Sequence, residues 1–236
     1  MPASFVGVGV GPGDPELLTL RALRTLRAAD RVFSPTMALD AVGRAESILR
    51  QAAPDVAVER LVFAIGPDDE ARAAAHVAAA ETVITHLDRG ELVAFITLGD
   101  PNVYSTFHHV AAIVMERRPG VVVETVPGIM AFQDLAARAG VVVADGSERL
   151  LVVSAVDGPE AVDGALGDGD AAVVVYKGGR HLPAIAHGLA AVDRLDAAVF
   201  GELLGLPGER IGPVKANAEG PAAYLSTVIV PPASRS

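Results

Sequence analysis

The stretch Gly7-Val-Gly-Val-Gly-Pro-Gly-Asp-Pro-Glu-Leu-Leu-Thr-Leu-Arg-Ala-Leu-Arg-Thr-Leu26 interrupts an apolar run with glycine and proline and then takes up helical spacing. Asp14 can cap the following helix through its side-chain oxygen, and Pro15 suits the first helical position. We therefore predict a strand over residues 4–10, a tight turn, and a helix over residues 15–28. Backbone N–H groups of such a turn face outward, where they can meet a ligand.

The turn does not match the common phosphate-binding loops. A dinucleotide fingerprint would require glycine where Pro12 stands, and no Gly-Lys-Ser/Thr sequence is present. Asp14 and Glu16 would also repel a pyrophosphate at the start of the helix. The pattern favours an uncharged or cationic ligand, although taken alone it is equally compatible with simple close packing of strand and helix.

Short β-branched segments alternate with alanine-rich helical segments along the whole chain, which is typical of an α/β fold. The first half has expected strands at 4–10, 31–35, 56–63, 92–98 and 121–126, and expected helices at 15–28, 41–51, 69–88, 104–116 and 130–139. The second half has expected strands at 149–156, 171–176, 197–203 and 224–230, and one expected helix at 181–190. Residues 146–148 and 157–170 are expected to be polar loops. The second half is richer in strands and has shorter helices than the first, which predicts two α/β domains, residues 1–125 and 126–236.

Two more Pro/Gly turns follow expected strands, at Leu98-Gly-Asp-Pro-Asn-Val-Tyr-Ser-Thr106 and at Val126-Pro-Gly-Ile-Met130. In a parallel sheet, ligands bind outside the carboxyl ends of the strands. Together with the first turn, these segments are expected to line one crevice. Asp100 has a second interpretation, as the cap of the helix that follows it, with Pro101 at the first helical position.

The composition of the 236 residues restricts the class of function. A formal net charge of -10 and an aromatic content of 4% argue against nucleic acid as the main partner. The absence of cysteine excludes disulfides, thiolate metal sites and a cysteine nucleophile. No apolar run approaches the length of a membrane span, and no export signal is apparent. We therefore expect a soluble, cytoplasmic enzyme that acts on a small molecule and does not associate with membranes.

The histidines do not indicate a metal site. His108 and His109 are adjacent and cannot share one helical face. The other histidines lack the spacing of metal ligands and are expected at the surface or in structural positions. Met37 and Met115 are expected in the core.

Four segments, in order along nearly the whole chain, resemble the tetrapyrrole (cobalamin-type) methyltransferase family: Val8-Gly-Val-Gly-Pro-Gly-Asp-Pro-Glu-Leu-Leu-Thr-Leu20, Gly99-Asp-Pro101, Val126-Pro-Gly-Ile129 and Tyr176-Lys-Gly178. The resemblance implies two α/β domains with S-adenosylmethionine bound in the cleft between them and S-adenosylhomocysteine as product. The family often has Ser or Thr where Met130 stands, so contact through the backbone is expected there. The cofactor-binding residues implied by the resemblance are Pro12, Leu98, Gly99, Asp100, Val103, Tyr104, Met130, Ala131, Lys177 and Leu204.

Within the family, the segments 97–107, 43–46, 130–137 and 224–227 are most similar to members that methylate precorrin-2 at C20, which implies that activity. Alternatives are the cobalt-containing substrate, another tetrapyrrole carbon, and a non-catalytic module that only binds the cofactor. Because the substrate carries many carboxylates, basic residues must gather locally in this acidic chain. The candidates are Arg44, Lys177 and Arg180, with solvated surface charge as the other interpretation. No catalytic base is identified, and a homodimer is implied by the resemblance only.

Overall fold

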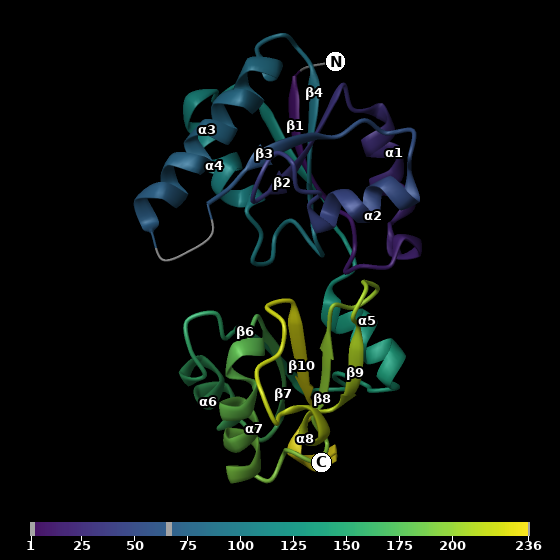
Figure 1. Ribbon diagram of the computed structural model, residues 1–236, viewed down its shortest axis with the longest axis vertical. Helices are drawn as coiled ribbons and strands as arrows, with labels where there is room; N and C mark the ends of the chain where they lie inside the picture. The colour runs from purple at the N-terminus through teal and green to yellow at the C-terminus, as the bar shows by residue number, and fades with distance from the viewer. Residues whose placement is uncertain (1–2, 65–67, 236) are drawn as a thin grey trace. The chain divides into compact units, whose positions relative to one another are not determined.

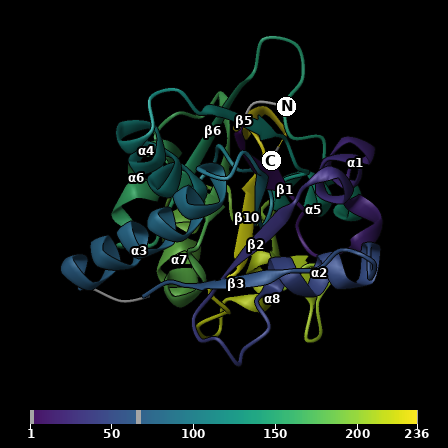
Figure 2. The same ribbon diagram turned by 90° about the horizontal axis from the view of Figure 1, so that it is seen from above.

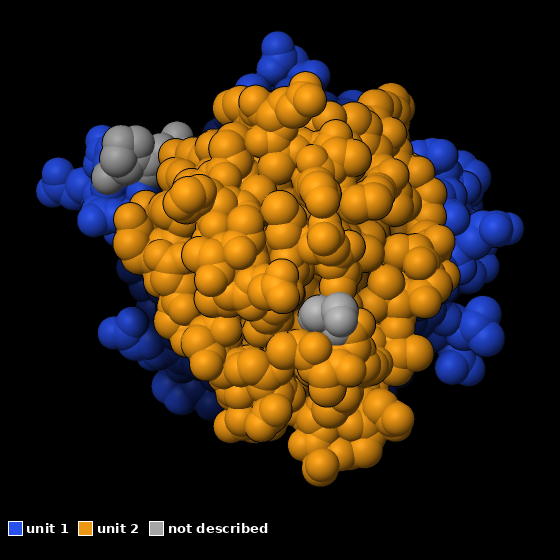
Figure 3. Space-filling view, turned by 90° about the horizontal axis from the view of Figure 1, so that it is seen from below, with its two compact units in different colours: residues 1–130 blue, residues 131–236 orange. Residues whose placement is uncertain are grey.

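The computed structural model describes residues 3–64 and 68–235. The chain forms two compact units, Met1–Met130 and Ala131–Ser236. Figure 3 shows the first unit in blue and the second in orange. Each unit has its own five-stranded sheet and its own helices. The fold is therefore two α/β units, as the sequence predicts.

Unit 1 is built on a fully parallel sheet with the strand order β3-β2-β4-β1-β5. Successive residues of a strand point to opposite faces, so Phe5 packs into one core and Val6 into another. Figures 1 and 2 both show α1 and α2 on one side of this sheet and α3 and α4 on the other. The strands are β1 (Ser4–Gly9), β2 (Arg31–Thr36), β3 (Glu59–Val62), β4 (Leu92–Thr97) and β5 (Val122–Val126), and the helices are α1 (Leu20–Ala28), α2 (Arg44–Ala52), α3 (Asp69–Leu87) and α4 (Phe107–Arg117).

Unit 2 is built on a mixed sheet with the strand order β6-β7-β10-β8-β9, in which only β6 and β7 are parallel. One face packs against α6 and α7, and the other packs against α5 (Figure 1). The strands are β6 (Arg149–Ser154), β7 (Ala171–Tyr176), β8 (Val199–Glu202), β9 (Arg210–Pro213) and β10 (Ser226–Val230), and the helices are α5 (Ala131–Ala139), α6 (Glu160–Leu166), α7 (Leu182–Ala191) and α8 (Val214–Asn217).

Three predicted helices begin later than expected, including the one predicted over 41–51, which begins at Arg44, and the cause is clear for the other two. The predicted helix over 15–28 is a short 3-10 turn, Pro15–Leu17, followed by α1, because the Thr19 hydroxyl accepts a hydrogen bond from Ala22 N (3.1 Å) and caps a new start. The helix predicted from residue 104 begins at Phe107. Tyr104 has a left-handed backbone (φ 48°), which an α-helix does not allow.

Three other expectations were wrong. The stretch 157–170, predicted as a loop, contains the helix α6. This helix has only seven residues, with Gly164 in its interior, so its helical pattern in the sequence is weak. The strand β9 and the short helix α8 were not predicted. Met37 and Met115, expected in the core, are both exposed.

A buried arginine holds the strand ends of unit 2. Arg194 is 1% exposed, and its Nη2 atom donates to Ala171 O (2.6 Å), at the start of β7, and to Pro231 O (2.6 Å), just after β10. Its Nη1 atom donates to Asp168 O (3.3 Å). The guanidinium thus donates hydrogen bonds to main-chain carbonyls at the strand ends, where the sheet offers them no partner.

No helix in the described part of the chain is long and apolar enough to cross a membrane.

We expect Arg194→Ala to destabilise the protein by about 3 kcal/mol or more, because it leaves buried carbonyls unsatisfied and opens a cavity. Urea unfolding followed by circular dichroism measures this, with exposed Arg89→Ala as the matched control. Equal midpoints for the two variants would contradict the role assigned to Arg194.

Candidate cofactor and substrate site

Three loops meet at the carboxyl edge of the unit 1 sheet. They follow β1, β4 and β5, which are neighbours in the order β4-β1-β5. Val10 N donates to Thr97 O (3.0 Å), and Gly99 N donates to Gly11 O (2.8 Å). The structure therefore brings together the three turns that the sequence analysis expected at one place.

Glycine allows the three backbones to approach closely. A Cβ atom on Gly128 would lie 2.1 Å from Gly99 O, and one on Gly9 would lie 2.4 Å from the same oxygen. At these two positions the glycines serve close packing, which was one of the two interpretations of the first turn. Gly99 differs, because its backbone is left-handed (φ 68°) and a Cβ there would have no neighbour within 4 Å. The backbone at Gly99 therefore faces open space beside the other two turns.

Asp100 joins the second loop to the third. Its Oδ1 atom accepts a hydrogen bond from Asn102 N (2.8 Å), and its Oδ2 atom accepts one from Gly128 N (3.0 Å). Asn102 Nδ2 also donates to Thr125 Oγ1 (3.1 Å) near the end of β5. The interpretation of Asp100 as a helix cap was wrong, because α4 starts only at Phe107. The carboxylate instead fixes the loop geometry of the site.

The remaining predicted residues of unit 1 differ in exposure. Leu98, Val103 and Met130 are half-buried, Pro12 is buried, and Tyr104 is exposed. Tyr104 is one of four non-glycine residues with positive φ among the described residues, and two others, Lys177 and Leu203, lie on the unit 2 loops considered next. Such conformations are costly and tend to occur where function requires them.

In unit 2, the predicted Tyr-Lys-Gly segment ends β7. Tyr176 Oη accepts a hydrogen bond from Phe132 N (3.1 Å), one of the N–H groups in the first turn of α5 that have no partner within the helix. The Lys177 ammonium lies 5.8 Å from the centre of the exposed Tyr224 ring. Lys177 and Tyr224 therefore form a cationic and aromatic pair at the end of the unit 2 sheet where β7 finishes and β10 begins.

A buried carboxylate, missed by the sequence analysis, organises the same end of unit 2. Glu202 is the last residue of β8, accepts hydrogen bonds from Ala223 N (2.5 Å) and from the Arg210 guanidinium, and precedes the loop with Leu204. Leu204 is buried against the core of unit 2. The sequence did contain a signal for this role, because Glu202 is an isolated acidic residue in an apolar strand. A buried acidic residue almost always has hydrogen-bonding or ionic partners.

The three predicted substrate-binding cations are in different states. Arg44 is exposed at the start of α2, and its guanidinium makes no hydrogen bond or ion pair within the described residues. The Arg180 guanidinium donates to Val156 O. Lys177 packs near Tyr224, as described above.

Ala131, a predicted cofactor-binding residue, is the first residue of α5 and is half-buried.

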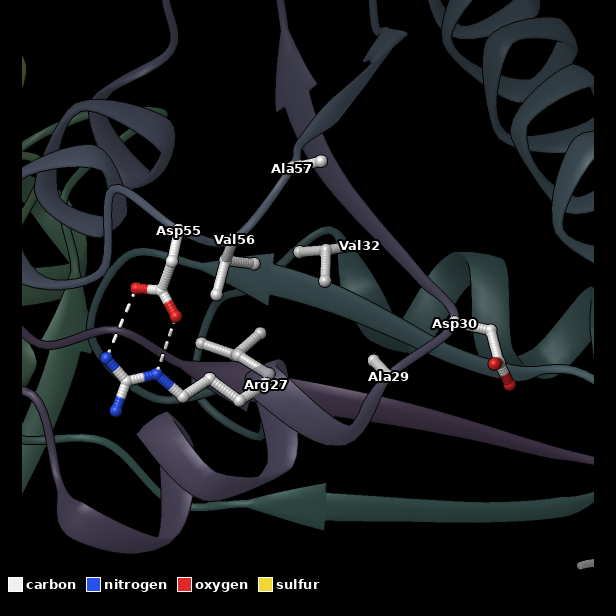
Figure 4. Close-up of a pocket in the computed structure, with 8 residues that line it drawn as sticks. Arg27, Ala29, Asp30, Val32, Asp55, Val56 and Ala57 are labelled. Carbon is white, nitrogen blue, oxygen red and sulfur yellow. Dashed lines mark hydrogen bonds and ion pairs between the residues drawn. The ribbon is translucent and has the colours of Figure 1, made fainter.

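A pocket at the other edge of unit 1 is not part of this arrangement. It has a volume of about 260 Å³ and lies among residues that precede β2 and β3 (Figure 4). Arg27 and Asp55 form an ion pair across its wall, with Arg27 Nε 2.9 Å from Asp55 Oδ2. Ligands of parallel sheets bind at the carboxyl ends of strands, so this amino-edge pocket does not compete with the three loops.

Two α/β units with glycine-rich loops at strand ends define a class of ligand-binding enzyme folds rather than one activity. Comparison with known proteins gives the family: the model of the Tetrapyrrole (Corrin/Porphyrin) Methylases matches residues 4–218. The chain belongs to this family.

Among its relatives, the precorrin-2 C(20)-methyltransferase of Sinorhizobium sp is 33% identical over 96% of this chain and 94% of its own length. The cobalt-precorrin-2 C(20)-methyltransferase of Salmonella typhimurium is 29% identical over 98% of this chain and 97% of its own length. The solved structure of a cobalt precorrin-4 methyltransferase has a TM-score of 0.70 and 17% identity, covering 96% of this chain and 94% of that one, and supports the fold.

Three histidines gather where α3 packs against α4. The rings of His76 and His109 stack with centroids 4.7 Å apart, and those of His108 and His109 are 3.8 Å apart. Burial, and then the neighbouring His108, lower the pKa of both His76 and His109, with Arg72 adding to the effect at His76. Within the described residues, no group of three or more His, Asp or Glu side chains could hold a metal ion.

The histidine cluster is expected to weaken the fold in acid. The ordinary histidine pKa is 6.5, so below about pH 6.5 the unfolded chain binds protons that the folded cluster resists. Stability should therefore fall with pH from about 6.5 downward, and less steeply in His76→Gln. Urea midpoints measured between about pH 7 and pH 5 test this, and an identical loss in both proteins would contradict it.

Proposed function

We propose that this protein transfers a methyl group from S-adenosylmethionine to C20 of precorrin-2, giving precorrin-3A in cobalamin biosynthesis. The observation that carries the proposal is the end-to-end match to the Sinorhizobium precorrin-2 C(20)-methyltransferase, 33% identical over nearly the full length of both chains. The match to a relative named for cobalt-precorrin-2 favours the cobalt-containing substrate as the second candidate.

The three loops of unit 1 fit the proposed methyl donor. Their residues 9–16, 98–106 and 126–130 contain no lysine or arginine, so nothing basic repels a sulfonium cation. Open space beside the left-handed Gly99 leaves room against the backbone, where a side chain would fill the site. Leu98 and Val103 offer apolar surface. Such a set of backbone and apolar groups suits a compact cation better than a pyrophosphate.

In this proposal the chain acts mainly by holding and desolvating the reactants. S-adenosylmethionine supplies a methyl group that is already activated by its attachment to a sulfonium. Asp100 fixes the second loop against the third, so the backbone that receives the donor is preorganised. Apolar side chains exclude water, which would otherwise stabilise the cation in its ground state. No covalent nucleophile is required, which agrees with a chain that contains no cysteine.

Binding of a polycarboxylic tetrapyrrole requires free positive charge in a protein of net charge -10. Most basic side chains are already committed to acidic partners in the described structure: Arg27, Arg31, Arg50, Arg60, Arg72, Arg117, Arg118, Arg138, Arg149, Arg210, Lys215 and Arg235. Among the described residues, Arg44 has no ion pair, and it begins α2 directly after the loop that follows β2. Lys177 lies directly after β7. We therefore assign a substrate carboxylate to Arg44. Lys177 and Arg180, in the segment after β7, are further candidates because of their position at a strand end.

The test is anaerobic incubation of the purified protein with methyl-labelled S-adenosylmethionine and precorrin-2, followed by mass spectrometry and NMR of the product. One added methyl group at C20 is the expected result. Label at another carbon would keep the family activity and overturn the C20 assignment. Cofactor binding without transfer to the metal-free or cobalt-containing substrate would favour a non-catalytic binding module.

Asp100→Ala is expected to weaken S-adenosylmethionine binding by about tenfold or more, because two backbone N–H groups lose a charged acceptor and the loops separate. Isothermal titration calorimetry measures the affinity. Asp68→Ala is the matched control, since Asp68 also accepts a backbone hydrogen bond, from Ala71 N (2.9 Å), but caps α3 instead. Unchanged affinity in Asp100→Ala would refute its role, whatever the outcome of the methylation assay.

A further inference from the structure

The loop between β2 and α2 displays apolar side chains to solvent. Met37 is 67% exposed, Leu39 68% and Val42 50%, and Val62 at the end of β3 is 42% exposed. Val62 pairs with Thr36 in the sheet, so it lies beside the start of the loop. We call Met37, Leu39, Val42 and Val62 the apolar platform. Single exposed apolar residues are ordinary, but a group of this kind on one loop and the neighbouring strand end indicates an interaction site.

Buried polar groups fix this loop in place. Glu46 is fully buried and accepts hydrogen bonds from Arg60 Nε (2.7 Å) and Nη2 (2.9 Å). The remaining nitrogen of the same guanidinium, Nη1, donates to Leu39 O (2.6 Å). The Thr36 hydroxyl donates to Ala41 O (2.9 Å) further along the loop. The Arg60 guanidinium also holds the pKa of Glu46 below its ordinary value, so the carboxylate remains charged and the anchor persists.

The apolar platform stands at the ligand-binding edge of unit 1. The loop follows the carboxyl end of β2, and Val62 is the last residue of β3. Both strands belong to the same parallel sheet as β1, β4 and β5, so their ends point toward the same edge as the three glycine loops. Arg44, which has no partner among the described side chains, begins α2 directly after the loop.

We propose that the apolar platform receives one face of the tetrapyrrole macrocycle and that Arg44 binds a carboxylate at the edge of that ring. This assignment rests on the proposed function and extends it to side chains on the β2–α2 loop. The chemistry is complementary, because a tetrapyrrole combines an apolar ring with carboxylates at its periphery. Four side chains are too few for a stable protein interface, which needs about 800 Å² from each partner, so a small ligand is the better occupant than a second copy of the chain.

The test compares the double variant Leu39→Ser/Val42→Ser with a control double variant, Met115→Ser/Val192→Ser. The control residues are also exposed, 49% and 42%, but they belong to other elements: Met115 lies on α4, and Val192 directly follows α7. For each protein we would measure KM and kcat with precorrin-2, fluorescence titration with uroporphyrin III as a stable tetrapyrrole probe, calorimetric affinity for S-adenosylmethionine, and mass by light scattering.

We expect the platform variant to raise the KM for precorrin-2 by roughly tenfold or more, with a smaller effect on kcat and none on S-adenosylmethionine affinity or on mass. The control should match the wild-type protein. Arg44→Met should also raise KM and reduce its dependence on salt, because a carboxylate contact is lost.

A KM within twofold of wild type in both the platform variant and Arg44→Met would overturn the inference while leaving the proposed function intact. A change in molecular mass would also overturn it, by showing that the loop contacts a second copy. If the wild-type protein neither methylates precorrin-2 nor binds uroporphyrin III, the proposed function fails first and the inference falls with it.

Discussion

The geometry of unit 1 depends on the close approach of three backbones at Gly9, Gly99 and Gly128. The Gly99 carbonyl lies where a Cβ of either other glycine would be, so no larger residue can occupy positions 9 or 128 without moving a loop. Packing of this kind removes side chains from the edge of the sheet and leaves main-chain groups there. A backbone surface held this tightly can recognise a compact ligand without large rearrangement on binding, which lowers the entropic cost of association.

Carboxylates that are buried or partly buried then determine where each loop goes. Glu46 with Arg60 anchors the loop after β2, Asp100 joins the loops after β4 and β5, and Glu202 with Arg210 anchors the loops next to β8 and β10. Buried ion pairs contribute little net stability, since desolvation offsets most of their attraction. Their value here lies in geometry, because each one fixes a main-chain donor or acceptor at a strand end, where regular hydrogen bonding stops.

The parts of the fold that could be predicted from the sequence are those determined locally. Glycine and proline after an apolar strand specify a tight turn wherever they occur, and the parallel strands follow from their alternation with helices. One failure was local, because the Thr19 hydroxyl caps α1 by accepting a hydrogen bond from Ala22 N, only three residues away. The exposure of Met37 depends instead on a distant residue, since nothing near Met37 in the sequence shows that Arg60 would hold its loop through Leu39 O.

The same distinction applies to the candidate site. Asp100 was identified from its motif, but its partner Gly128 lies 28 residues away, so its role as a link between loops required the folded chain. The net charge of -10 argued against nucleic acid, and it required that basic residues gather locally to bind a substrate with many carboxylates. In the structure, most basic side chains are neutralised by acidic neighbours, and Arg44 is an exception at a strand end. A single uncompensated cation next to apolar side chains determines the local field more than the total charge does, so an acidic protein can present a surface suited to a carboxylate-bearing ring.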